Sequence, residues 1–492
     1  MKSINDFVLS VLFAICLFTV NSYAQENTVS VNWNNTLFVS RTTPTLQLVE
    51  NPMVRPGSPI HKNVFKALKD LQADYVRYVP WFPYPKMAVA ELEPPTKTNT
   101  FWDFTYLDST MIAFMEATKG HDAVINFSTI PVWMWETKEK VTYPDDAYKT
   151  SWNYNQGTKL RDTTMKELAN YFARLFSWYT KGGFTDELGK FHKSTHHYKI
   201  AYWEVLNEPD LEHQISPQLY TKMYDAIVSE LKKISPETKF VGISVAHTTN
   251  PEYFEYFLNA KNHKPGIKVE GISYHHYSSP SVEGQPIEYY QYTFFEKADA
   301  FIDRVRYIEN IRKRLAPKTF TMINELGVIL RSPQLSGPID TSYWNLAGAM
   351  YAHLFLELTK IGIDVVGESQ LVGYPTQFPD VSMVNWENGN PNARYWVLKL
   401  LIDNFHPGDK LVQTDVKAPG VTAQGFTGSK NRKILLINKK NTRIELTLNA
   451  ATSAAKMSYV DLTTGENPPA SINLTNGKIT LEPFAVAVVD LR

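Results

Sequence analysis

Eight short apolar runs alternate, between residues 45 and 405, with longer segments that repeat apolar residues at helical spacing. An apolar run of this length is typical of a buried strand, and the repeat is typical of a helix. The predicted strands lie at residues 46–49, 74–79, 123–127, 200–206, 240–245, 269–274, 320–324 and 363–367. Eight such strand–helix units fit an α/β fold, a closed (β/α)8 TIM barrel with long loops.

A doubly wound open sheet is the alternative fold for this alternation. That fold usually carries a glycine-rich phosphate turn, and the sequence has neither a G-x-G-x-x-G nor a Walker A motif. From residue 406 to 492 the apolar residues alternate with period two, and turn residues separate the runs. This part is predicted to form a small antiparallel β-sandwich, and the strand-like segment 25–44 is a candidate for the same domain.

Two helix starts carry recognisable signals. Thr164 and Glu167 have the spacing of a capping box. Ser216 is followed by Pro217, which predicts a helix with a serine cap and proline in its first position.

Residues 1–24 are typical of a secretory signal peptide. Lys2 precedes an apolar stretch, residues 7–20, that is shorter than the ~20 residues of a membrane helix. Cleavage after Ala24 would give a secreted or periplasmic chain without cysteine, because Cys16 is the only one. An uncleaved anchor and a lipid on Cys16 are the alternatives. No later stretch is long and apolar enough for a membrane span, so none is expected.

Charge gives no reason to expect nucleic acid or anionic lipid as a partner, because 50 basic and 50 acidic residues balance. Aromatic residues make up 13% of the chain. Most are expected in the core, and a surplus suits a cleft that stacks sugar rings. The oligomeric state stays open.

Two glutamates follow predicted barrel strands at the ends that form an active-site rim. Asn207-Glu208-Pro209 ends the fourth strand, and Asn324-Glu325 ends the seventh. Retaining glycosidases need two carboxyl groups about 5 Å apart, one as acid/base and one as nucleophile. Two glutamates on one rim can meet this requirement. Taken singly, each could also be a helix cap or a solvated surface charge.

The motif Trp-Glu-x-x-Asn-Glu-Pro at 203–209, with the later Glu325, resembles clan A of the glycoside hydrolases. Within the clan the chain is most similar to family 39, which holds β-xylosidases and α-L-iduronidases. The resemblance implies that Glu208 is the acid/base and Glu325 the nucleophile, and that no cofactor is needed. A raised pKa for Glu208 and an ionised Glu325 would suit these roles.

The resemblance extends to residues beside the two glutamates. It implies that Arg77 holds Glu325 ionised and that Tyr277 contacts the nucleophile. It also implies that Asn207 binds the sugar 2-hydroxyl and that His275 lines the site. A metal site on His275 and His276 is the competing interpretation. Neighbouring residues of a strand point to opposite faces, so we expect no metal there.

Three further residues are candidates for binding sugar. Trp133 and Trp135 follow the third predicted strand, although both could equally be core residues, and Glu368 ends the eighth. The loops 82–103, 136–160 and 370–391 match nothing in the family. The sugar, the linkage and exo or endo action therefore stay open.

The sequence thus predicts an enzyme that hydrolyses O-glycosidic bonds of oligo- or polysaccharides with net retention. Its partner would be a carbohydrate. A catalytically inactive carbohydrate-binding protein is one alternative. A transglycosidase that uses the same two glutamates is another.

Overall fold

The computed structural model describes residues 26–154, 157–330, 339–428, 431–449 and 455–491. The predicted signal peptide, with Cys16, lies outside the described residues. No helix in the described ranges is long and apolar enough to cross a membrane.

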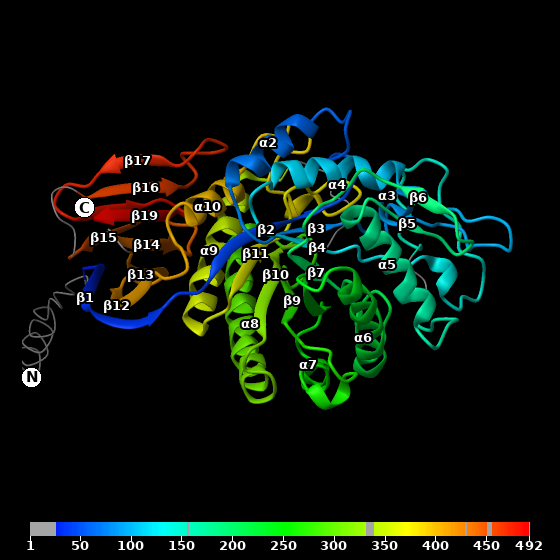
Figure 1. Ribbon diagram of the computed structural model, residues 1–492. Coiled ribbons are helices and arrows are strands. Elements are labelled where there is room, and N and C mark those ends of the chain that lie inside the picture. Colours follow the sequence, from blue (N-terminus) through cyan, green and yellow to red (C-terminus); the bar gives the residue numbers. More distant parts are fainter. Residues whose placement is uncertain (1–25, 155–156, 331–338, 429–430, 450–454, 492) are drawn as a thin grey trace, which may run out of the picture.

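A closed barrel of eight parallel strands forms the centre of the molecule (Figure 1). The strands are β2 (Thr43–Val49), β3 (Val76–Val79), β4 (Ala123–Ile125), β7 (Tyr202–Glu204), β8 (Lys239–Val245), β9 (Gly271–Ser278), β10 (Phe320–Val328) and β11 (Val365–Glu368). They are hydrogen-bonded in this order, and β11 closes the ring on β2. The predicted (β/α)8 barrel is confirmed.

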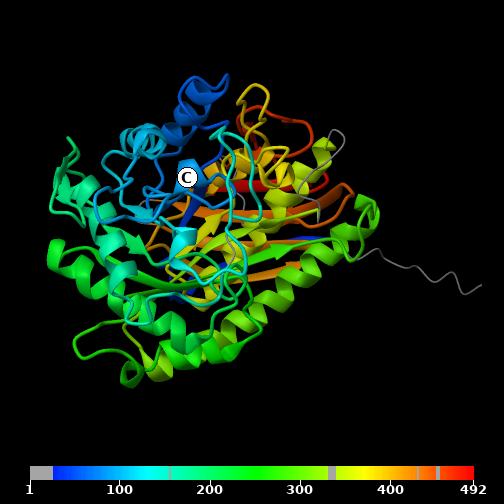
Figure 2. The same cartoon turned by 90° about the vertical axis from the view of Figure 1, so that its right-hand side faces the viewer.

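Helices surround the strands, as the turned view in Figure 2 shows. They are α2 (His61–Leu71), α3 (Pro85–Ala88), α4 (Thr105–Ala117), α5 (Lys166–Thr180), α6 (Pro217–Ile234), α7 (Pro251–Phe257), α8 (Ile287–Leu315), α9 (Thr341–Ile361) and α10 (Ala393–Ile402). A two-stranded ribbon, β5 (Gly183–Thr185) and β6 (Phe191–Lys193), follows α5.

One of the two predicted helix caps is confirmed. Ser216 caps α6 by accepting a hydrogen bond from Leu219 N, and Pro217 is its first residue. The capping box predicted at Thr164 is wrong, because α5 begins at Lys166. The Asp162 carboxylate instead accepts hydrogen bonds from the backbone N–H groups of Glu167 and Thr164.

The barrel interior has an apolar layer and a polar layer. Val124, Tyr202, Val241, Met322 and Val365 form a buried cluster near the N-terminal ends of their strands. Inward-facing residues alternate along a barrel strand, so the next inward layer lies nearer the C-terminal ends. That layer is polar and supplies the floor of the candidate site.

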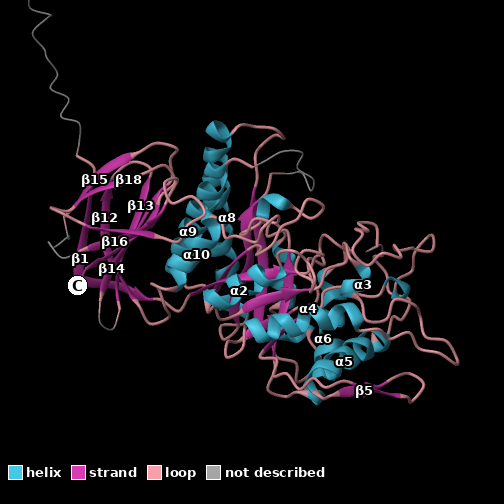
Figure 3. Cartoon of the chain, turned by 90° about the horizontal axis from the view of Figure 1, so that it is seen from above, coloured by secondary structure: helices cyan, strands magenta, loops and turns pink. Residues whose placement is uncertain are grey.

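The C-terminal residues form a second domain beside α9 and α10 (Figure 3). Its strands are β12 (Lys410–Lys417), β13 (Val421–Thr427), β14 (Arg432–Asn438), β15 (Ile444–Leu448), β16 (Lys456–Val460), β17 (Ala470–Asn473), β18 (Lys478–Leu481) and β19 (Val486–Leu491). The N-terminal strand β1 (Thr28–Val39) pairs with β12 and β15.

These nine strands make one mostly antiparallel sheet, with β17 at one edge and β18 at the other. Residues near both edges, Met457 on β16 and Ile479 on β18, belong to one buried apolar cluster. The sheet must therefore curve around that cluster, which gives the sandwich-like core that the period-two pattern predicts.

Candidate active site

A cavity of about 670 Å³ opens at the C-terminal ends of the barrel strands. Among the described residues, its lining includes Asn207, Glu208, His275, Tyr277 and Glu325. The rim of a TIM barrel is built from the loops after its strands, so the cavity lies where catalytic residues of this fold gather. Five of the residues singled out in the sequence thus share one site.

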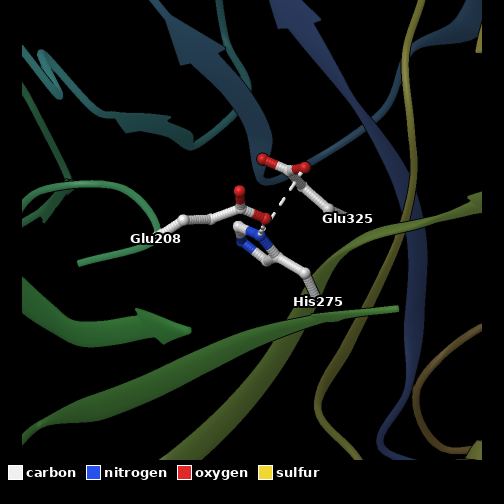
Figure 4. Close-up of side chains that lie close together, drawn as sticks. All are labelled: Glu208, His275 and Glu325. Carbon is white, nitrogen blue, oxygen red and sulfur yellow. Dashed lines mark hydrogen bonds and ion pairs between the residues drawn. The ribbon is translucent and has the colours of Figure 1, made fainter. Parts of the chain in front are cut away.

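Glu208 and Glu325 approach each other closely in this cavity. One carboxylate oxygen of each lies within 4.8 Å of the other, with a nitrogen of His275 in the same cluster (Figure 4). Glu325 belongs to β10, and Glu208 follows β7 on a turn where its φ is 38°. The Glu208 backbone N–H donates to Ser244 O at 2.9 Å, which fixes this turn against the end of β8.

Glu325 is placed among groups that favour its charged form. Arg77 Nη1 donates to Oε1 at 2.5 Å, and the Tyr277 hydroxyl donates to Oε2 at 2.7 Å. Burial alone would raise the pKa of Glu325, but His275, Arg77 and the hydrogen bonds outweigh it and lower the pKa below its usual value. Glu325 is therefore suited to act as an anion.

Glu208 has the opposite environment. Its Oε1 lies 2.7 Å from His275 Nδ1, and the other ring nitrogen of His275 lies 3.1 Å from Ser244 Oγ. Burial raises the pKa of Glu208, the contact with His275 opposes this rise, and the negative charge of Glu325 adds to it. The net direction is upward. Glu208 is therefore suited to hold a proton that Glu325 cannot hold.

Arg77 is fully buried beneath the two glutamates and joins several strands. Besides Glu325, it donates to Glu204 Oε2 at 2.5 Å, to Gln47 Oε1 at 2.6 Å and to Asn207 Oδ1 at 2.7 Å. Glu204 supplies a second negative charge that compensates the guanidinium. A buried charge needs such pairing to be tolerated.

The Glu204 carboxylate also accepts hydrogen bonds from three neutral side chains, Asn126, Ser273 and Asn324. No role was predicted for Glu204 from the sequence, although it lies in the Trp-Glu-x-x-Asn-Glu-Pro motif. A signal was available: Glu204 is an acidic residue on an otherwise apolar strand, at an inward-facing position.

A third carboxyl group of the cavity, Glu212, was also missed. It accepts hydrogen bonds from Trp81 Nε1 at 2.7 Å and from Asn207 Nδ2 at 2.8 Å. Burial and the nearby Glu208 raise its pKa well above the usual value. Its position four residues after Glu208 is the only sequence signal, and neighbouring polar residues made it resemble a surface loop.

Aromatic side chains form another wall of the cavity. The ring centroid of Trp152 lies 5.5 Å from that of Trp81 and 5.9 Å from that of Phe378, and all three residues line the cavity. Trp152 and Phe378 come from the loops 136–160 and 370–391, which no sequence pattern could place. Rings of this kind can stack on the apolar face of a sugar.

Three candidate sugar-binding residues, Trp133, Trp135 and Glu368, lie outside the lining of this cavity. Residues Val132–Met134 form a 3-10 turn, from which the Trp133 indole donates to Glu91 O. Trp135 is buried with its ring stacked on His213 at 4.3 Å. Glu368 is also buried.

The Glu368 carboxylate accepts a hydrogen bond from Arg394 Nε at 2.8 Å. Glu368 and Trp135 are thus buried within the protein, whereas the half-buried Trp133 lines a second, smaller pocket. None of the three is placed to meet a sugar in the cavity between Glu208 and Glu325.

Glu208, His275 and Glu325 have the donor types and spacing of a possible cation site. A cation there would lie beside the guanidinium of Arg77, and the two positive charges would repel each other. The neighbouring His276 does not add a ligand, because its ring stacks on Phe301 of α8 at 4.4 Å. The donor set therefore suits proton transfer better than metal binding.

No family model matches the chain, and no curated protein matches it by sequence. Solved structures match over nearly the whole chain. The GH51 arabinofuranosidase from Xanthomonas axonopodis pv. citri is 11% identical, with a TM-score of 0.66 over 95% of this chain and 100% of that one. The GH30 endoxylanase from Clostridium papyrosolvens C71 is 14% identical, with a TM-score of 0.58 over 94% and 100%.

A conserved exported protein from Bacteroides fragilis is 11% identical, with a TM-score of 0.63 over 94% of this chain and 100% of that one. At this level of identity the similarity establishes the fold. It covers the barrel and the C-terminal sheet together.

Proposed function

We propose that this protein is a retaining glycoside hydrolase. The observation that carries the proposal is the approach of the Glu208 and Glu325 carboxylates, whose nearest oxygens lie within 4.8 Å of each other. Retaining enzymes place their carboxyl groups about 5–5.5 Å apart, whereas inverting enzymes leave about 6.5–9.5 Å for a water molecule. The opposite pKa directions of the two groups support the same assignment.

In the proposed reaction, Glu325 attacks the anomeric carbon while Glu208 donates its proton to the departing glycosidic oxygen. This step forms a covalent glycosyl–enzyme bond and releases the leaving group. Glu208, now ionised, takes a proton from water, and the water oxygen displaces Glu325 from the sugar. Arg77 and Tyr277 hold the Glu325 carboxylate in place through their hydrogen bonds.

Asn207 is proposed to bind the sugar 2-hydroxyl. Its amide oxygen accepts from Arg77, and its amide nitrogen donates to Glu212. Ser244 Oγ also lies 3.5 Å from the amide oxygen. These contacts fix the plane of the amide beside Glu208 and leave one amide hydrogen for a ligand. A hydrogen bond to the 2-hydroxyl would strengthen as the transition state forms.

Clan A is the proposed wider group, because the matched structures include a GH51 arabinofuranosidase and a GH30 endoxylanase. Family 39, which the motifs resemble, is the finer proposal. The names of the matched structures make arabinosides and xylosides the first substrates to test. Galactosides and uronic-acid glycosides follow.

Residues 1–24 are proposed to direct secretion and to be removed after Ala24. The apolar stretch behind Lys2 supports this proposal, as does the name of the exported protein from Bacteroides fragilis among the matched structures. Intact-mass measurement of the chain from an export-competent bacterial host should give Gln25 as the first residue. An uncleaved leader, or a lipid on Cys16, would contradict this.

The activity is tested with a panel of nitrophenyl glycosides and polysaccharides, read by released nitrophenol or sugar. Wild type is compared with Glu208→Gln, Glu325→Gln and the surface control Glu230→Gln, which loses only an ion pair with Lys233. We expect hydrolysis by wild type and by the control, and a loss of about 10³-fold or more in Glu325→Gln.

Glycan binding without turnover in the wild type would instead support a carbohydrate-binding protein. Products longer than the substrate, formed when a sugar acceptor is added, would indicate a transglycosidase. Full activity in either active-site variant would reject the roles assigned to Glu208 and Glu325.

A further inference from the structure

Arg304 of α8 is a half-buried cation in the wall of the cavity. It is the only lysine or arginine among the described lining residues. Its Nε donates to Thr248 Oγ1 at 3.1 Å, and its guanidinium lies 6.0 Å from the ring of Phe301. No carboxylate of the described residues forms an ion pair with it, and the sequence of residues 331–338 contains no acidic residue.

The buried arginines of the described chain, in contrast, each have a carboxylate partner. Arg77 pairs with Glu204 and Glu325, Arg312 pairs with Glu309, and Arg394 pairs with Glu368. Removing a guanidinium from water has a free-energy cost that an anion normally offsets. Arg304 is half-buried and has part of this cost without a protein anion, because burial lowers its pKa and no acidic neighbour opposes the shift. An anion from outside the chain would complete this environment.

The carboxylates that share the cavity are already engaged elsewhere. Glu325 is hydrogen-bonded to Arg77 and Glu208 contacts His275, while Glu212 accepts from Trp81. None of them is the partner of Arg304. The guanidinium therefore remains available to a ligand that enters the cavity.

Arg304 lies on the side of the cavity formed by the ends of β8 and β9. Thr248 follows β8, and His276 is part of β9 next to His275. The loop after β8 is tied to the loop that carries Glu208, because Asp210 accepts hydrogen bonds from Ala246 N and His247 N. The Thr248 loop, which the Arg304 guanidinium contacts, therefore adjoins the loop of the proposed acid/base, next to which the leaving group must lie to receive a proton.

His276 adds a neutral polar group on this side. Burial lowers its pKa to about 3, and the positive charges of Arg304 and Lys297 act in the same direction. The imidazole is therefore uncharged at neutral pH. Its Nε2 lies 3.2 Å from Ser278 Oγ. The other ring nitrogen and the Thr248 hydroxyl are therefore the neutral hydrogen-bonding groups on this side.

We propose that Arg304 binds an anionic substituent, a carboxylate or a sulfate ester, on the leaving-group part of the sugar substrate. This inference rests on the proposed glycosidase function and specifies its substrate class as acidic glycans. The guanidinium forms charge-assisted hydrogen bonds with the anion, and Thr248 holds it in position. The neutral sugar bound between Glu208 and Glu325 needs no charge of its own.

Binding to catalytically blocked Glu325→Gln protein tests the inference without requiring turnover. The probes are two matched pairs: glucuronic-acid-substituted xylo-oligosaccharides with their carboxyl-reduced counterparts, and sulfated galacto-oligosaccharides with their desulfated counterparts. Calorimetry compares Arg304→Gln and Arg304→Lys with the same blocked parent. The matched control is Arg306→Gln, an exposed arginine of the same helix that pairs with Asp303.

The parent should bind the acidic member of one pair about tenfold or more tightly than the neutral member, a preference typical of one charge-assisted pair. Arg304→Gln should abolish the preference and leave binding of the neutral member unchanged. Arg304→Lys should keep part of it, and Arg306→Gln all of it. The pair that responds identifies the anion as carboxylate or sulfate.

Equal binding within both pairs, no binding of either acidic probe, or a preference that survives in Arg304→Gln would overturn the inference. Turnover of neutral nitrophenyl glycosides by the wild type is measured in parallel. Turnover without an acidic preference refutes the role of Arg304 alone, whereas loss of both refutes the proposed function as well.

Discussion

Tyr277→Phe tests how the protein keeps Glu325 ionised. The variant removes one hydroxyl, which donates to Glu325 Oε2 at 2.7 Å and lies 2.6 Å from Ser369 Oγ. The ring stays in place, and the contacts of Arg77 and His275 with Glu325 are untouched. The change therefore isolates one stabilising hydrogen bond to the charged carboxylate.

A hydrogen bond to a charged group contributes about 1.5–3 kcal/mol, and one pKa unit corresponds to about 1.4 kcal/mol. Losing the bond should raise the pKa of Glu325 by about 1–2 units. Because the nucleophile must be ionised, the acidic limb of kcat/KM against pH should move upward by the same amount. The basic limb, which reports Glu208 as the acid, should move much less.

Tyr351→Phe is the matched control. Its hydroxyl comes from α9, is buried, and lies within hydrogen-bond distance of the backbone oxygens of Val366 (2.9 Å) and Thr45 (3.3 Å), so it contacts neither glutamate. This variant should lose about 0.5–1.5 kcal/mol of stability and keep the wild-type pH profile. A uniform loss of activity at every pH in Tyr277→Phe, with no shift of the acidic limb, would show that the Tyr277 hydroxyl does not lower the pKa of Glu325.

Three further changes have defined outcomes. Glu325→Gly should lose nearly all activity and regain part of it with azide, which replaces the missing nucleophile; no rescue would speak against that role. Glu208→Gln should retain far more activity on dinitrophenyl glycosides than on alkyl glycosides, because a good leaving group needs no proton. An equal loss of activity on both substrates would contradict the role of Glu208 as the acid.

Burial raises the pKa of Glu50 to about 8. The protonated side chain therefore contributes fully to stability below about pH 4.5, and this contribution is lost as pH rises through 8. Glu50→Gln should flatten the pH dependence of the free energy of unfolding between pH 5 and 8.5, by at most about 1.4 kcal/mol per pH unit. The free energy of unfolding is measured by urea titration at each pH, and the wild-type pH dependence in the variant would count against this.

The barrel and the placement of its two glutamates were predictable because both follow from local patterns. Strand and helix periods identify the units, and the barrel rule brings the ends of the fourth and seventh strands to one rim. The alternation of side chains also predicted that the rings of His275 and His276 point apart. In the structure one contacts Glu208 and the other stacks on Phe301.

The failures concern contacts between residues distant in sequence. Glu368 lies at a strand end, as predicted, but Arg394 of α10 binds it within the protein. Trp133 and Trp135 follow a strand, but neither lines the cavity: Trp133 belongs to the 3-10 turn at Val132–Met134, and Trp135 directly follows that turn. In neither case does the local sequence reveal the partner.

The remaining cavity residues lie in loops and in a long helix, where the sequence does not predict their position in the site. Trp152 and Phe378 meet across the cavity from loops that have no periodic pattern. Arg304 lies in the middle of α8, where helical periodicity alone would assign it to a surface. Only the way α8 packs beside β9 brings its guanidinium to Thr248 and the substrate cavity.

Trapping with a 2-deoxy-2-fluoro dinitrophenyl glycoside, chosen from the sugars that the protein hydrolyses, would show whether Glu325 is the nucleophile. The fluorine slows hydrolysis of the covalent intermediate, so mass spectrometry of peptic peptides can locate the bound sugar. We expect one sugar per chain, attached to Glu325. A label on Glu208, Glu212 or any other carboxylate, or rapid inactivation without a covalent label, would contradict it.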